Sequence, residues 1–156
     1  MDEVESRTVK LQPTLVVRGK VATGDIKEFL GRAYHLVFVR AGECGAHFSG
    51  PPFARCHALD SEFSEFEIEA GAPVVALVPC SGEVEPSELP AGPVAATWHV
   101  GPYEEMEAAY DSITAWMNDH GATPDGPPWE VYHTDPNEEP DPQKWRTEVI
   151  QPYRPS

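Results

Sequence analysis

A short motif recurs in this chain at a fixed spacing, and this recurrence limits the folds that are open to it. The letters GPPF at residues 50–53 return as GPPW at residues 126–129, a spacing of 76 positions. Tyr34 and Tyr110 are separated by the same spacing, and no gap is needed between the two matches. Such a match indicates that one supersecondary unit occurs twice, so we expect two halves that are built alike.

The first half, about residues 8–79, has the pattern of one helix among strands. From Ile26 to Ala41, apolar residues recur every three or four positions, which is the stripe of an amphipathic helix, and Gly42 or Gly45 can end it. Runs rich in β-branched and aromatic residues predict three strands, at residues 8–18, 53–58 and 66–70. The order of elements is therefore strand, helix, strand, strand.

The second half, about residues 94–153, repeats this order after a proline-rich linker at residues 80–93. Its helix has an apolar stripe from Met106 to Met117 and ends at Gly121. Its strands are predicted at residues 94–99, 129–133 and 145–150.

The repeat predicts an α+β fold in which tandem duplicated βαββ units form a curved antiparallel sheet with two main helices. A chain of 156 residues fits a single domain, residues 1–156. Duplicated units of this kind leave a central cleft between them, and clefts are favoured sites for small ligands. We therefore expect a pocket where the two halves meet.

Composition excludes several classes of partner. The formal charge of −15 makes nucleic acid and anionic membranes poor partners, because phosphate binding depends on clustered Lys and Arg. No apolar run approaches the roughly 18 residues that a membrane helix needs. The acidic N-terminus, MDEVESRTVK, has no signal-peptide pattern and is interpreted as a frayed leader. We expect a soluble, cytoplasmic protein that binds cations or neutral molecules.

The cysteines do not form a recognisable framework. Cys44, Cys56 and Cys80 are odd in number and irregular in spacing, which argues against disulfides and for a reducing compartment. Cys44, His47, Cys56 and His57 do not have the spacing of a structural zinc site, and adjacent residues of a strand face opposite sides. We expect neither a metal nor another cofactor.

Alternation along the last two predicted strands suggests a site. Alternate residues of a strand share a face, so Glu148 and Ile150 lie together, and Tyr132 on the preceding strand could face the same cavity. By the same count, Trp129 and Trp145 point away from Glu148. A glutamate in an otherwise apolar strand is costly to bury without a partner, so Glu148 is either exposed, paired or functional.

The motifs resemble a known family. HVGPYEEM at residues 99–106, GPPWEVYHTDP at 126–136 and TEVIQPY at 147–153, with GPPFARCHALD at 50–60, resemble the GyrI-like family, which includes bacterial effector-binding domains. The resemblance implies an α+β tandem with a central pocket. It also implies one of two activities: binding of small molecules, as in multidrug-responsive regulators, or hydrolytic opening of cyclopropane rings in DNA-alkylating natural products.

The resemblance also implies roles for residues. Glu148 matches the glutamate that faces cationic aromatic ligands, Tyr132 matches a pocket aromatic, and Ile150 would line the same wall. Trp98 and Phe38 are further candidates for the ligand site, although a place in the core explains either residue as well. Phe38 is expected on the inner stripe of the first helix, where it could form the floor of the cleft.

Two hypotheses follow, and the sequence does not decide between them. In the first, the chain is a stand-alone, multidrug-like binding protein for lipophilic aromatic cations. In the second, it is a cyclopropane-opening hydrolase in which Glu148 activates water and Tyr132 polarises a carbonyl. The chain contains no helix-turn-helix segment, so we expect no direct binding of nucleic acid; a protein partner, such as a topoisomerase contacted through the acidic surface, stays open.

Overall fold

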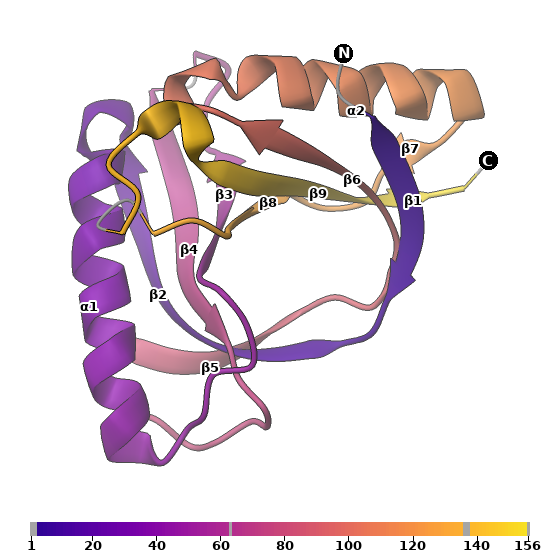
Figure 1. Cartoon of the computed structure of the whole chain (residues 1–156). Helices are drawn as coiled ribbons and strands as arrows, with labels where there is room; N and C mark the ends of the chain where they lie inside the picture. The colour runs from indigo at the N-terminus through magenta and orange to yellow at the C-terminus, as the bar shows by residue number, and fades with distance from the viewer. Residues whose placement is uncertain (1–2, 63, 136–137, 156) are drawn as a thin grey trace. The chain divides into compact units, whose positions relative to one another are not determined.

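The computed structural model describes residues 3–62, 64–135 and 138–155. The chain divides into two units: unit 1 comprises Met1–Lys10 and Ala91–Ser156, and unit 2 comprises Leu11–Pro90. Each unit is described by itself, because the positions of the two relative to one another are not determined (Figure 1).

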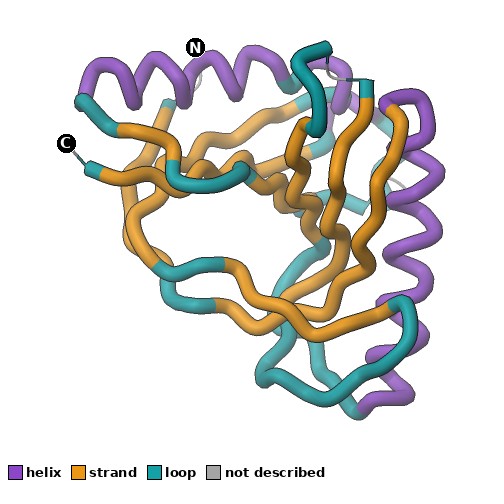
Figure 2. Tube along the Cα trace, turned by 180° about the vertical axis from the view of Figure 1, so that it is seen from behind, coloured by secondary structure: helices purple, strands orange, loops and turns teal. Residues whose placement is uncertain are grey.

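Unit 2 is a four-stranded antiparallel sheet with one long helix. Its strands lie side by side in the order β3-β4-β2-β5. The helix α1 lies along the strands of its own unit, as Figure 2 shows from behind. The elements are β2 (Gln12–Ala22), α1 (Ile26–Cys44), β3 (Phe53–Ala58), β4 (Glu65–Pro73) and β5 (Val84–Leu89), with a short 3-10 turn at Thr23–Asp25.

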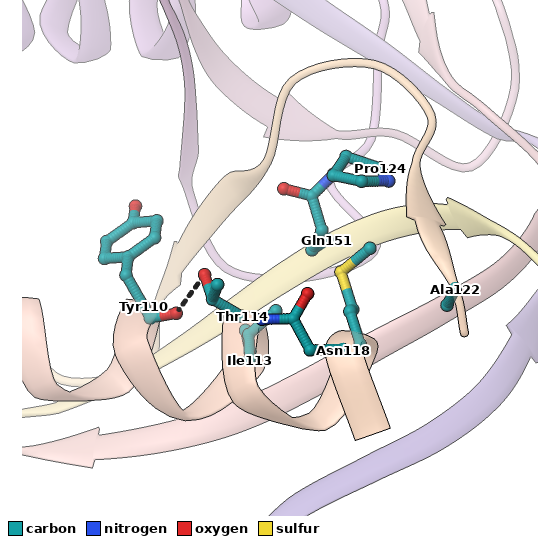
Figure 3. A pocket seen from close by; sticks show the side chains of 8 residues that line it. Tyr110, Ile113, Thr114, Asn118, Ala122, Pro124 and Gln151 are labelled. Carbon is teal, nitrogen blue, oxygen red and sulfur yellow. Dashed lines mark hydrogen bonds between the residues drawn. The ribbon is translucent and has the colours of Figure 1, made fainter. Parts of the chain in front are cut away.

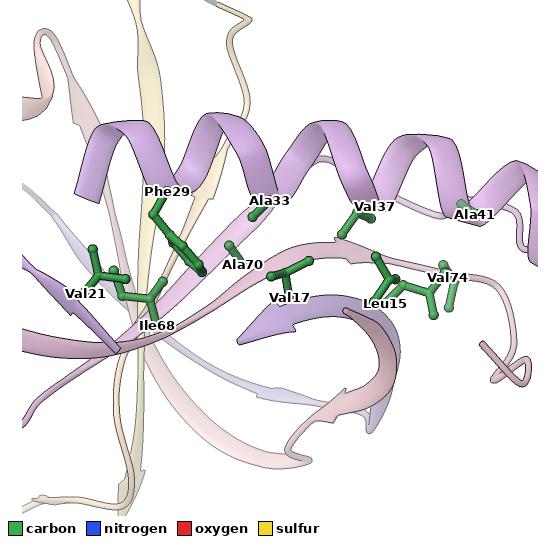
Figure 4. Close-up of a cluster of buried hydrophobic side chains, with 11 residues drawn as sticks. Leu15, Val17, Val21, Phe29, Ala33, Val37, Ala41, Ile68, Ala70 and Val74 are labelled. Atoms are coloured by element: carbon green, nitrogen blue, oxygen red, sulfur yellow. The ribbon is translucent and has the colours of Figure 1, made fainter. Parts of the chain in front are cut away.

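The core of unit 2 forms where the apolar stripe of α1 meets the sheet (Figure 4). The helix ends at Gly45, whose φ of 75° is left-handed and whose N–H donates to the carbonyl of Ala41, so the second of the two predicted stops is used. The buried helix side chains are Phe29, Ala33, Val37 and Ala41, and the sheet supplies Leu15, Val17, Val21, Ile68, Ala70, Val74 and Val84.

Gly71 allows a close approach of two strands in this unit. It lies opposite Val16 in the pairing of β2 with β4. A Cβ atom at Gly71 would lie 1.8 Å from the carbonyl oxygen of Leu15, far inside van der Waals contact. The glycine is therefore required by packing of backbone against backbone.

Unit 1 has the same plan. Its strands lie in the order β8-β9-β6-β1, and the short β7 pairs with β9. Helix α2 covers one face, and Ala95, Met106, Ala109, Ile113, Met117 and Val149 form the core between helix and sheet. The elements are β1 (Val4–Val9), β6 (Gly92–Val100), α2 (Glu107–His120), β7 (Thr123–Pro124), β8 (Trp129–Tyr132) and β9 (Arg146–Arg154), with 3-10 turns at Tyr103–Glu105 and Pro142–Lys144.

The fold class is α+β, with antiparallel strands and two main helices, as predicted. The order strand, helix, strand, strand is found in unit 2 as β2-α1-β3-β4 and, apart from the two-residue β7 that follows the helix, in unit 1 as β6-α2-β8-β9. Each unit adds a fourth strand beside the first of these, β5 in unit 2 and β1 in unit 1. Among the described helices, none is long and apolar enough to span a membrane.

Two segments that were expected to be irregular are strands. The acidic N-terminus contains β1, whose residues from Val4 to Val9 pair with β6. The predicted linker at residues 80–93 contains β5, which pairs with β2. Both predictions were wrong because charged and proline residues are tolerated on strands at the end of a sheet, where one side needs no ladder hydrogen bonds.

The prediction of no disulfide is also wrong. Cys44, at the end of α1, is bonded to Cys80 in the connection between β4 and β5, and the two Cα atoms are 5.7 Å apart. Cys56 does not take part in this disulfide. Spacing along the chain could not reveal a bond between residues 36 positions apart. The cysteine pattern therefore no longer argues for a reducing compartment.

Candidate functional site

Glu148 is a buried carboxylate in the middle of β9. Its neighbour Val149 packs in the α2 core, and successive strand residues alternate, so Glu148 projects from the face opposite α2. The residue is 7% exposed. A carboxylate so far removed from water needs a charged or hydrogen-bonding partner.

Arg7 supplies that partner. Its Nη1 donates to Oε2 of Glu148 at 3.0 Å, across a separation of 141 residues in the chain. Nε2 of His133 lies 3.7 Å from the other carboxylate oxygen, Oε1. Arg7 is also 3.9 Å from Glu5, and a third of its side chain is exposed. The carboxylate of Glu148 therefore has the guanidinium of Arg7 bonded to one oxygen and the imidazole of His133 near the other.

Trp98 lies directly opposite Glu148 in the pairing of β6 with β9, so both side chains share one face. The indole is 36% exposed. Its ring centroid is 4.6 Å from that of His133, and the guanidinium of Arg146 lies 4.7 Å from the centroid of the indole. We call this surface the Glu148 face; it consists of Arg7, Trp98, His133, Arg146, Glu148 and Ile150.

The sequence pattern pointed to only part of this face. Ile150 lies on it as predicted, opposite Ala96 and Trp129, and is 5% exposed. Arg7 was missed because its segment was interpreted as a leader. His133 was missed because it alternates with Trp129, which was expected to point away from Glu148.

Trp129 lies on the face that was not expected for it. It is 3% exposed and lies opposite Ile150, so it is on the Glu148 side of the sheet. Trp145 precedes β9 and packs against Tyr103, with ring centroids 4.9 Å apart. The prediction that Trp129 points away from Glu148 is wrong.

Tyr132 lies on the opposite face from Glu148. It pairs with Thr147, and its hydroxyl donates to Oε1 of Glu130 at 2.8 Å. Glu130 also accepts a hydrogen bond from the hydroxyl of Tyr110, which belongs to α2. The predicted shared face of Tyr132 and Glu148 is therefore wrong, because the register of β8 against β9 places Val131 opposite Glu148.

Tyr103 extends this aromatic cluster. Its ring meets that of Tyr132 edge to face, with centroids 5.5 Å apart. Burial raises the pKa of the Tyr103 phenol above its usual value, and the carboxylates of Glu130 and Asp135 raise the pKa further. The phenol is thus held in its neutral form.

Phe38 does not lie on the inner stripe of α1. It is 72% exposed and stacks on Phe48, with ring centroids 6.3 Å apart. Val37, the residue before it, is the one that packs into the core. The prediction of an inward-facing Phe38 is wrong because the apolar pattern was broader than the stripe that the sheet can cover.

Glu69 occupies in unit 2 the place that Glu148 occupies in unit 1. It is also 7% exposed, but two arginines hold it: Arg18, opposite it on β2, and Arg55, opposite it on β3, at 3.0 and 2.9 Å. The hydroxyl of Ser87 on β5 adds a third donor at 3.3 Å. Polar side chains from β2, β3 and β5 therefore surround the carboxylate of Glu69.

In unit 1 the corresponding positions are different. Trp98 takes the place of the arginine on the first strand, and Val131 takes the place of the arginine on the adjacent strand. The fourth strand supplies the arginine that pairs with Glu148, Arg7. The two buried glutamates therefore share a position in the sheet but differ in their neighbours.

A small pocket of about 110 Å³ lies on the α2 side of unit 1 (Figure 3). Two of its polar side chains are satisfied, because the amide of Gln151 donates to two backbone carbonyls and the hydroxyl of Thr114 donates to the backbone carbonyl of Tyr110. Drug-sized ligands need roughly 300 Å³ or more. Across the residues that the structure describes, no three His, Cys, Asp or Glu side chains are grouped so as to hold a metal ion.

The chain belongs to the GyrI-like small molecule binding domain family, whose sequence profile matches residues 2–154. No curated protein matches it. The class of protein is thus a small-molecule binding domain.

Solved structures with this fold are distant in sequence. The C-terminal domain of EcmrR has a TM-score of 0.87 and 17% identity, over 100% of this chain and 99% of that chain. A hydrolase from Listeria innocua has a TM-score of 0.71 and 15% identity, over 97% and 92%. SAV2435, solved with bound tetraphenylphosphonium, has a TM-score of 0.69 and 10% identity, over 97% and 94%.

Proposed function

We propose that this protein binds lipophilic, aromatic, cationic small molecules at the Glu148 face. The observation that carries the proposal is the pairing of a buried carboxylate, Glu148, with a partly exposed indole, Trp98, directly across the sheet. A carboxylate supplies the counter-charge for a cation, and an indole supplies a flat surface and a cation–π contact. Ile150 adds apolar contact on the same face.

Long-range electrostatics act in the same direction. The formal charge of −15 raises the concentration of cations near the protein and repels anions. SAV2435, which shares the fold, was solved with an aromatic phosphonium cation. Its ligand is of the class that we propose for this chain.

We interpret the two units as products of a duplication, because their strand orders and the positions of Glu69 and Glu148 correspond. On this interpretation only one copy of the carboxylate serves the ligand. Glu69 already has two arginines and a hydroxyl around it, whereas Glu148 has an indole and a valine on its flanks. Unit 1 would then supply the chemistry of the site.

Fluorescence titration tests the proposal. A rhodamine cation should quench tryptophan emission saturably, and Glu148→Gln should weaken its binding at least about tenfold, as expected for loss of a partly buried charge pair. Glu88→Gln is the matched control, because it removes the same charge from an exposed position on β5 and should leave the affinity unchanged. Equal affinities for all three proteins would remove Glu148 from the site.

A second candidate function is hydrolysis of strained electrophiles. It is favoured by the carboxylate–imidazole pair of Glu148 and His133, 3.7 Å apart, which can hold a water molecule. The water oxygen would bond to a cyclopropane carbon as the ring C–C bond breaks, and the electron pair would pass into a conjugated carbonyl. Glu148 would take one proton of the water, the carbonyl oxygen would gain a proton from solvent, and Glu148 would then return its proton to solvent.

In the hydrolase hypothesis Tyr132 polarises that carbonyl. Its hydroxyl lies on the α2 face of the sheet, opposite the face of Glu148, so Tyr132 is not placed for this role. The test is incubation with a cyclopropane-bearing alkylator and mass spectrometry of the products. A ring-opened product that forms faster than in buffer, and more slowly with Glu148→Gln, would support hydrolysis; formation at the buffer rate would exclude it for that substrate.

A further inference from the structure

Both parts of the proposed ligand site are occupied by the protein's own guanidinium groups. Arg7 donates a hydrogen bond to Glu148 at 3.0 Å, where the charge of a ligand would lie. Arg146 lies 4.7 Å from the ring centroid of Trp98, where the aromatic cation of a ligand would stack. A cationic ligand therefore has to compete with two planar cations of the chain.

The position of Arg7 allows a ligand to displace its side chain from Glu148. It belongs to β1, which lies at the end of the sheet of unit 1, and a third of its side chain is exposed. Glu5, two residues away on the same face of the strand, is 3.9 Å from its guanidinium and two thirds exposed, so it offers a second, solvated partner. Arg55, by contrast, holds Glu69 from a side chain that is only 18% exposed.

Displacement of Arg7 would remove a donor from a carboxylate that is 7% exposed. A ligand that brings N–H groups can replace that hydrogen bond, whereas a fully alkylated cation would leave a buried oxygen without a donor. The cost of that unpaired oxygen would count against the alkylated cation.

We propose that Arg7 is a built-in stand-in for the ligand, and that the site selects aromatic amidinium or guanidinium compounds over fully alkylated cations of the same shape. This inference rests on the proposed binding function. It also separates this chain from SAV2435, whose bound tetraphenylphosphonium has no N–H group.

A matched pair of probes tests the selectivity. Biphenyl-4-carboxamidine and biphenyl-4-yl-trimethylammonium have the same aromatic body and the same charge, but only the first has N–H donors. Isothermal titration calorimetry should show that the amidine binds about tenfold more tightly, the effect of one charge-assisted hydrogen bond. In Glu148→Gln this preference should disappear.

A variant of Arg7 tests the competition. Arg7→Gln removes the competing charge and keeps an amide donor, so the amidine should bind about tenfold more tightly than to the unaltered protein. Arg32→Gln is the control: it removes the same charge from an exposed ion pair with Glu83 on the other unit and should change nothing. Thermal melts establish that the variants are folded, and Arg7→Met, which removes the charge but keeps a side chain of similar length, serves if Arg7→Gln is not.

The outcomes are distinguishable. If neither probe binds saturably to any protein, both the proposed function and this inference fail. If both probes bind through Glu148 with equal affinity, and the Arg7 variants bind no more tightly than Arg32→Gln, the function stands and the inference is overturned. If the protein prefers the amidine and the Arg7 variant binds the amidine more tightly, the inference is supported.

Discussion

Trp98 and Glu148 lie directly opposite one another on neighbouring strands, and their side chains project from the same face of the sheet. In unit 2 the same relationship joins Arg18 to Glu69. One pair is an aromatic ring beside a carboxylate, and the other is an ion pair. This difference turns two corresponding positions into a candidate ligand site in one unit and a satisfied polar network in the other.

Trp98→Ala should weaken binding of an aromatic cation about tenfold, because it removes both the stacking surface and the cation–π contact. Trp98→Phe keeps a smaller ring and should recover part of the affinity. Calorimetry measures both variants. An affinity that is unchanged in Trp98→Ala would show that the indole does not contact the ligand.

Tyr132→Phe should leave ligand affinity within about twofold of the unaltered protein, because the hydroxyl donates to Glu130 on the α2 face. It should lower the free energy of unfolding by about 1 kcal/mol through loss of that hydrogen bond. Urea unfolding and ligand titration measure the two effects. A tenfold loss of affinity would restore the ligand role that the family resemblance implies for Tyr132.

Tyr103 should make stability depend on pH in the alkaline range. Its pKa is raised in the folded protein by burial and by Glu130 and Asp135, so above about pH 10 the unfolded chain loses this proton first. Because the unfolded state then binds fewer protons, stability falls as pH rises, and the contribution present below pH 10 is lost.

Tyr103→Phe removes the part of the alkaline decrease in the free energy of unfolding that is due to this phenol. The measurement is the free energy of unfolding of both proteins at about pH 9 and pH 11. The advantage of the unaltered protein over Tyr103→Phe should shrink between the two values. A constant difference would contradict the raised pKa.

Gly71→Ala should destabilise the protein by about 3 kcal/mol or more, because its Cβ would lie 1.8 Å from the carbonyl oxygen of Leu15. Gly31→Ala is the control. Gly31 lies within α1, where a Cβ would meet nothing within 4 Å, so alanine should stabilise the protein by about 0.5–1 kcal/mol. Urea unfolding of the two variants should therefore give changes of opposite sign.

Local pattern was sufficient for the elements of the fold. The stripe on α1 and the left-handed glycines Gly45 and Gly121 marked where the helices lie and end, and both glycines are at the helix C-termini in the structure. The strand at Phe53–Ala58 was predicted with its bounds. These features depend on residues within a few positions of one another, which is the range over which sequence pattern is informative.

The site required more than local pattern. Alternation assigns the residues of a strand to two faces, but it does not say which face of one strand meets which face of the next. The register of β8 against β9 placed Trp129 and not Tyr132 on the side of Glu148. A shift of one residue would have reversed that result.

The sequence by itself determined that a glutamate stands in an apolar strand, that Ile150 shares its face, and that the chain contains two similar βαββ patterns. Only the tertiary structure decided what surrounds the glutamate. Arg7 reaches it from 141 residues away, because the N-terminal segment pairs with β6 beside β9. Contacts across a sheet are set by strand order and register, and neither is written in the local pattern of any one strand.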